Sequence, residues 1–181
     1  MRRILAPLAL LFAVSSCSAP EPEPAPVAPP AKPVVVAPTS PQLQQPKGDW
    51  IDWPLTSGDW VYRRDERGSI ALFGSPNGDA LVTLRCDTAR GRIYLSRAGV
   101  LNGYGNGSGT MTIRSSSTLK QFPATSTGGN PPYIAVEIMP SDPILDAMIY
   151  SRGRIALETQ PQLSIAIPNW AEIGRVVEDC R

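Results

Sequence analysis

The chain has 181 residues, which suits one domain with a hydrophobic core better than two. Its 17 basic and 16 acidic residues nearly cancel, so we expect no binding to nucleic acid, which selects clustered positive charge. Histidine is absent, and this excludes Ser-His and Cys-His nucleophile pairs and most zinc sites. We therefore expect no catalytic residue, no metal and no cofactor.

Residues 1–16 have the pattern of a bacterial lipoprotein signal peptide. Two arginines precede the apolar run 4–14, which is too short to span a bilayer comfortably. The run ends in Val-Ser-Ser before Cys17, an arrangement that resembles the lipobox, where the leader is cut before a cysteine whose thiol carries diacylglycerol. The best-known lipobox has Leu where this chain has Val14. The alternative is an ordinary secreted protein whose leader contains a cysteine.

Residues 17–47 are predicted to be a lipidated Cys17 followed by a proline-rich disordered stalk. Ten prolines lie between Ser18 and Lys47, and proline both fixes φ and removes a backbone donor. Such a segment favours an extended polyproline II spacer, although its PxxP-like spacings also allow a docking ligand. By the lipobox resemblance, Ser18 after the cysteine implies an outer-membrane lipoprotein that faces the periplasm, with the inner membrane and the cell surface left open.

Residues 48–181 are predicted to form one β-rich globular domain. Short apolar alternations, separated by Gly, Asn and Pro, are typical of strands with one buried face. We expect strands at 60–62, 70–73, 80–86, 93–97, 110–114, 119–122, 133–139, 155–159 and 163–167. This spacing predicts an antiparallel β-sandwich or open barrel of about eight or nine short strands.

Turn and cap residues divide these strands. The segment 75–79 (SPNGD) predicts a hairpin turn, because Asn-Gly tolerates a positive φ. A short helix is expected within 141–150, and a second one at the carboxyl terminus over 170–179. Asn169 with Glu172 predicts a capping-box start for the second helix. Its expected apolar stripe consists of Trp170, Ile173 and Val177.

Two cysteines remain besides Cys17. Cys86 lies on the apolar side of a predicted strand, and Cys180 ends a helix that must pack on the domain. In an oxidising compartment these two are the natural disulfide pair. We expect their bond to fasten the carboxyl-terminal helix to the domain.

The carboxyl-terminal segment 145–181 combines a short helix, S-R-G-R, two strands, P-x-W, a helix and D-C. In this order it resembles uncharacterised lipoproteins of sphingomonad-type alphaproteobacteria. More distantly, Gly58-Asp59-Trp60 and the strand-strand-helix ending resemble invasion-associated-locus-B-like proteins, which are small β-sandwiches. Neither resemblance implies an activity or a catalytic residue.

Aromatic residues are the first binding candidates. Trp50 and Trp53 lie in a stretch with three tryptophans, and tryptophan is frequent at binding hot spots. They suit either a peptidoglycan or protein site, or packing where the stalk meets the domain. Tyr104 belongs to the glycine-rich segment 103–109, which we expect to be a hairpin loop that can also act as a mobile binding loop.

Charged residues give further candidates. Arg152 and Arg154 suit an anionic ligand, or else a helix end and a solvated strand. Asp142 and Asp146 have the spacing of a helical carboxylate pair, but helix capping explains both. The segment 117–120 matches S-x-x-K, yet it lacks the partner motifs and the helix of penicillin-binding proteins.

We therefore expect a lipid-anchored envelope protein that acts as a non-catalytic binding or structural module. Its expected contacts are the membrane, through the lipid, and an envelope protein or peptidoglycan. The alternative is a small hydrolase of envelope glycans that works without histidine.

Overall fold

The structure is a computed structural model that describes residues 44–101 and 107–181. The predicted signal peptide, Cys17, nearly all of the predicted stalk, and Tyr104 lie outside these residues. Within the described part of the chain, no helix is long and apolar enough to cross a membrane.

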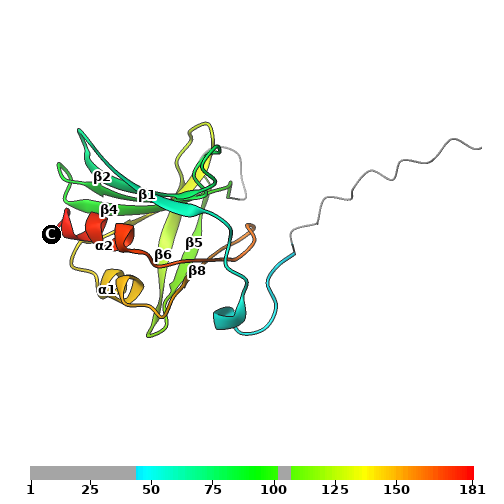
Figure 1. Ribbon diagram of the computed structural model, residues 1–181. Helices are drawn as coiled ribbons and strands as arrows, with labels where there is room; N and C mark the ends of the chain where they lie inside the picture. Colours follow the sequence, from blue (N-terminus) through cyan, green and yellow to red (C-terminus); the bar gives the residue numbers. More distant parts are fainter. Residues whose placement is uncertain (1–43, 102–106) are drawn as a thin grey trace, which may run out of the picture. The chain divides into compact units, whose positions relative to one another are not determined.

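Nine strands form a single antiparallel sheet that curls into a half-barrel, which confirms the predicted mainly β fold (Figure 1). Of the two architectures left open, the open barrel is the one observed. The sheet order is β1-β2-β3-β4-β7-β6-β5-β8-β9. The strands are β1 (Asp59–Asp65), β2 (Gly68–Gly74), β3 (Val82–Asp87), β4 (Arg92–Ala98), β5 (Ser108–Arg114), β6 (Leu119–Ser126), β7 (Tyr133–Ile138), β8 (Ile155–Thr159) and β9 (Ile165–Ile167).

The curl of the sheet is concentrated between β7 and β6. These strands pair through only two residue pairs, whereas β4 and β7 share six. Beyond that short ladder β6 leaves β7, so β1, β2 and β4 cross the direction of β5, β6 and β8 in Figure 1. The bend creates the inner face that the helices close.

Two helices cover the inner face: α1 (Pro143–Ile149) and α2 (Ala171–Glu178). The core lies between them and the sheet, and its fully buried side chains come from alternate strand positions. Trp60 belongs to this core, with its ring 5.3 Å from that of Phe73 and its Nε1 donating to the Pro168 carbonyl at 2.7 Å. The largest fully buried side chains are Phe73, Leu84, Ile93, Leu95, Met111, Ile113, Ile134, Ile138, Ile144, Leu145, Met148 and Ile155.

Cys86 and Cys180 form the predicted disulfide. It joins β3 to the second residue after the carboxyl-terminal helix, with the Cα atoms 5.5 Å apart. Since α2 packs on β1, β2 and β3, the bond holds this helix against the sheet.

The structure contradicts the expected mechanism of two local features, the 75–79 turn and the start of α2. The 75–79 turn exists, but it is closed by Gly78 N–H donating to the Ser75 carbonyl, and no residue in it has a positive φ. A seven-residue connection has room for an ordinary turn, so the Asn-Gly property is not needed.

The second wrong mechanism concerns the start of α2. Trp170 is the N-cap and makes no side-chain cap bond, and it is 46% exposed rather than part of the apolar stripe. Asn169 instead donates to the carbonyls of Ile149 and Ser151 at the end of α1. This tertiary contact replaces the predicted capping box, and Val176 takes the place of Trp170 beside Ile173 and Val177.

Arg97 is the charged exception on the inner face of β4. It is 3% exposed, and its guanidinium donates to the carbonyls of Leu157 and Leu163 across the half-barrel. Burial lowers the pKa of Arg97 to about 10, and no carboxylate among the described residues pairs with it. The side chain connects β4 to the β8–β9 hairpin. The cost is the free energy of removing its charge from water.

Candidate functional site

The tryptophan candidates belong to a strap that runs over β8 and β9. Trp53 is 8% exposed and packs on Ala156 and Ala166, whose small side chains leave room for its ring. Trp50, within a 3₁₀ turn (Trp50–Asp52), is half-buried against the same cluster. Trp53 therefore follows the packing alternative and is not open to a ligand.

The strap begins earlier than residue 48. The side chain of Gln45 donates to the Gln162 carbonyl and accepts from Ser164 N–H. Farther along, Thr56 N–H donates to the Ala166 carbonyl at 2.8 Å. These bonds cover the free edge of β9, and within residues 44–101 the strap already contacts the domain at Gln45.

The two predicted arginines have different surroundings. Arg154 is half-buried, and its Nη1 donates to the Trp53 carbonyl, so it fastens the strap. Arg152 is exposed in the turn between α1 and β8. Its backbone N–H donates to Ser116 Oγ, and its guanidinium has no hydrogen bond to another described residue. The structure does not bring the two guanidinium groups into one site.

The remaining candidates have structural partners. Asp142 caps α1 by accepting from Ile144 N–H, and it also accepts from Lys120 Nζ at 2.5 Å. Asp146 pairs with Arg181 at 2.8 Å. Lys120 is thus bound to the helix cap, while Ser117 lies in the β5–β6 turn beside Ser115.

A groove lies elsewhere, on the outer face of β3, β4, β7 and β6. Its volume is about 640 Å³. The register aligns its side chains in two rows across the strands. The first row has short side chains and consists of Thr83, Ser96, Ala135 and Thr125. The second has long side chains and consists of Arg85, Tyr94 and Glu137.

This difference in length hollows the sheet surface. Successive outward positions on a strand are about 6.8 Å apart, so the long row stands as a wall beside the short one. Arg67, from the β1–β2 turn, and Arg90, from the β3–β4 turn, complete the wall at one end of the groove.

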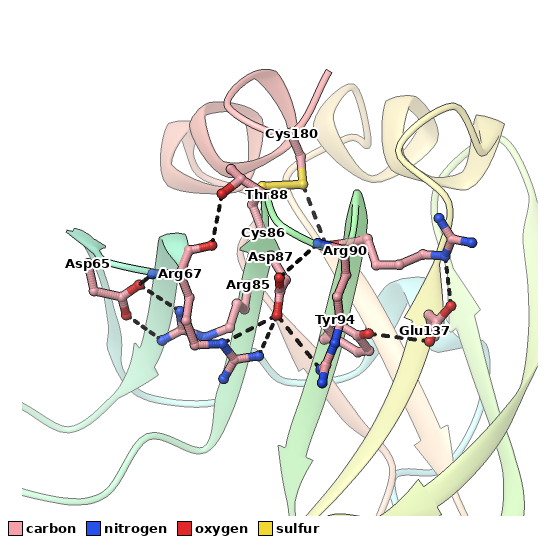
Figure 2. Close-up of polar contacts among 11 residues, drawn as sticks. Asp65, Arg67, Arg85, Cys86, Asp87, Thr88, Arg90, Tyr94, Glu137 and Cys180 are labelled. Atoms are coloured by element: carbon pink, nitrogen blue, oxygen red, sulfur yellow. Dashed lines mark hydrogen bonds and ion pairs between the residues drawn. A yellow bond between two sulfur atoms is a disulfide. The ribbon is translucent and has the colours of Figure 1, made fainter.

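Ion pairs hold this wall in place (Figure 2). Arg85 donates through both Nη atoms to the two oxygens of Asp65, at 2.9 and 2.7 Å. Glu137 accepts from Arg92 Nε at 2.8 Å and from the Tyr94 hydroxyl at 3.3 Å. Both contacts leave the paired groups on the outer face.

Asp87 is the buried carboxylate of the cluster, with a side chain only 6% exposed. Its Oδ2 accepts from Nη2 of Arg67 at 2.8 Å, and Arg90 Nη1 lies 3.8 Å from the same oxygen. Its Oδ1 accepts from Arg90 N–H at 3.1 Å. The hydrogen bond from Arg67, with that from Arg90 N–H, lowers the pKa of Asp87 below its usual value.

The Asp87 carboxylate therefore pairs with two guanidinium groups. The whole cluster of ion pairs has four arginines for three carboxylates: Arg67, Arg85, Arg90 and Arg92 with Asp65, Asp87 and Glu137. The Arg67 and Arg90 side chains are 55% and 67% exposed. An exposed, incompletely neutralised guanidinium binds carboxylate or phosphate through paired hydrogen bonds. The groove is thus suited to an anionic ligand. Within the described part of the chain, no three Cys, Asp or Glu side chains converge as a metal site.

Sequence reasoning did not find this groove, because its residues come from four strands and three of the connections between strands. A signal was nevertheless present in the outward positions of consecutive strands. Thr83 with Arg85, and Ser96 with Tyr94, repeat a small polar residue two positions from a long polar one. Without the register, the repeat cannot be placed across the sheet.

The chain was compared with protein-family models, curated proteins and solved structures, and none of the three comparisons gave a match.

Proposed function

We propose that this protein is a lipid-anchored, non-catalytic module that binds an anionic component of the bacterial envelope in the arginine-lined groove. The observation that carries the proposal is that Arg67 and Arg90, which both line a groove of about 640 Å³, share the single carboxylate of Asp87. A bound anion would supply the second negative charge that these two arginines lack within the cluster.

The ion pairs around the groove favour binding over the alternative, hydrolysis of envelope glycans. A glycoside hydrolase needs one carboxyl that stays protonated as the general acid. Here Asp65 and Asp87 each accept from an arginine, which lowers the pKa of both below the usual value. A carboxylate that stays charged can position an arginine, but it has no proton to donate to a leaving group.

The anchor is proposed from the amino-terminal sequence. The Cys86–Cys180 bond accounts for two of the three cysteines and agrees with an oxidising compartment. Cys17 is then the third cysteine, at the position where the lipobox pattern places the acylated residue. Stable attachment of this kind takes more than one acyl chain.

Anion binding is tested with the full chain in detergent, titrated with inorganic phosphate at low ionic strength. We expect saturable binding that Arg90→Gln weakens about tenfold, since a charge-assisted hydrogen bond contributes roughly 1.5 kcal/mol or more. Arg152→Gln is the matched control, because it removes another exposed arginine that does not line the groove. Equal binding by the wild type and Arg90→Gln would refute the proposed site.

The anchor is tested separately by Cys17→Ser in a bacterium with two membranes. The variant should leave the membrane fraction and lose incorporation of labelled palmitate, while Ser40→Ala in the linker should change neither. Membrane retention and labelling of Cys17→Ser would show that the leader is not a lipoprotein signal.

A further inference from the structure

A row of hydroxyl groups lies directly beside the arginine wall. Thr83 on β3 pairs with Ser96 on β4, Ser96 pairs with Ala135 on β7, and Ala135 pairs with Thr125 on β6. Four adjacent strands spaced about 4.8 Å apart give this row a length of roughly 14 Å. The floor of the groove is therefore long and rich in hydroxyls.

These hydroxyls are open to a ligand. Thr83 and Ser96 are half-buried and Thr125 is exposed, and among the described residues their side chains form no hydrogen bond. Each hydroxyl can donate one hydrogen bond and accept two. A row of such groups suits a partner that presents many donors and acceptors of its own.

The position of most of the groove also argues against recognition through a peptide backbone. An extended peptide adds to a free sheet edge, where strand N–H and carbonyl groups are unpaired. The groove instead lies over the outer face of β3, β4, β7 and β6. β3 and β4 are paired along both sides, and β7 pairs along its length with β4 and through Ile134 and Ala135 with β6. Over β3 and β4, therefore, only side chains face the ligand.

From these observations, and resting on the proposed function, we infer that the groove binds an acidic saccharide. Sugar hydroxyls contact Thr83, Ser96 and Thr125 along the floor. The carboxylate or phosphate of the saccharide binds at the end of the groove, between the exposed guanidinium groups of Arg67 and Arg90. Tyr94 adds an aromatic side chain with a polar tip to the wall, as is common where one face of a ligand is apolar.

The test uses the full chain in detergent and four probes: trigalacturonate, glucose 6-phosphate, neutral maltotriose and inorganic phosphate. We expect at least one of the two acidic saccharides to bind about tenfold more tightly than both maltotriose and inorganic phosphate. Whichever acidic saccharide binds better identifies the acid group, and either result supports the inference.

The hydroxyl row is tested by the double variant Thr83→Val with Thr125→Val. Valine keeps the shape and β propensity of threonine, so the fold should persist with an unchanged thermal midpoint. Loss of the hydroxyls should weaken binding of the acidic saccharide about tenfold and leave phosphate binding unchanged. Thr110→Val, on β5 outside the groove, is the matched control.

Two kinds of failure are distinguishable. If maltotriose or phosphate binds as tightly as both acidic saccharides, or if the double variant retains saccharide affinity, the saccharide inference is overturned while the anion site stands. If Arg90→Gln weakens none of the probes, or if no probe binds, the proposed function fails as well.

Discussion

The two faces of β3 and β4 differ in burial and in the chemistry of their side chains. On the inner face, Leu84, Cys86, Ile93 and Leu95 are fully buried against the core. On the outer face of the same strands, Thr83, Arg85, Tyr94 and Ser96 line the groove. Because side chains alternate along a strand, each neighbour in the sequence belongs to the opposite face.

This comparison indicates that the inner face stabilises the fold and that the outer face is the one suited to a ligand. The inner face contributes apolar burial and the disulfide, which together dominate the free energy of folding. The outer face contributes partly exposed ion pairs, which stabilise little but fix the positions of guanidinium groups. Substitutions on the two faces should therefore have separable effects.

The disulfide on the inner face should give the largest effect. The sequence separation of Cys86 and Cys180 is 94, and closing a loop of that length stabilises the folded state by about 4.7 kcal/mol in the chain-entropy model. Cys86→Ala with Cys180→Ala should lower the free energy of unfolding by this amount in urea denaturation. Reduction of the wild type should approach the same value, while the double variant should not respond to reductant. An unchanged urea midpoint on reduction would contradict the pairing.

Adjacent residues of β4 give the next largest effect and the most direct comparison of the two faces. Leu95→Ala should lower the free energy of unfolding by about 3 kcal/mol, because it opens a cavity in the core. Ser96→Ala should change it by less than about 0.5 kcal/mol. The same two variants should show the reverse order in saccharide affinity. Comparable losses of stability at both positions would contradict the separation of the faces.

The alternation that separates the faces is also why the fold was predictable. A period of two can be read from one strand alone, and each of the nine expected segments overlaps an observed strand. Cys86 was assigned to the inner face by the same alternation, which led to its pairing with Cys180. These predictions needed only local information.

The groove and the strap depend on distant residues instead. Arg92 meets Glu137 because β7 inserts between β4 and β6 in the sheet, an order that no local pattern contains. Trp53 is buried because Ala156 and Ala166 leave space for it. Asn169 similarly does not cap α2, because its side chain donates to two carbonyls at the end of α1. In each case a tertiary partner decided between alternatives that were locally equivalent.

Asp87 should give the smallest effect, which appears as a change in how strongly the free energy of unfolding falls between neutral and acid pH. The hydrogen bond from Arg67 keeps its folded-state pKa below the usual value of 3.8, and Arg85 acts in the same way on Asp65. A depressed folded pKa gives stability that is present above the unfolded pKa and is lost as pH falls through the folded pKa. The wild type should therefore lose stability below about pH 4, and Asp87→Asn should lose less between pH 7 and pH 3.

Urea denaturation at those two pH values measures the difference. Asp52→Asn is the control, since Asp52 is exposed and forms no ion pair with another described residue. If Asp87→Asn retains the full acid sensitivity of the wild type, the Arg67–Asp87 contact does not stabilise the fold. If it loses that sensitivity and also loses anion affinity, then the carboxylate acts on the ligand by orienting Arg67 and Arg90, because its own negative charge would repel an anion.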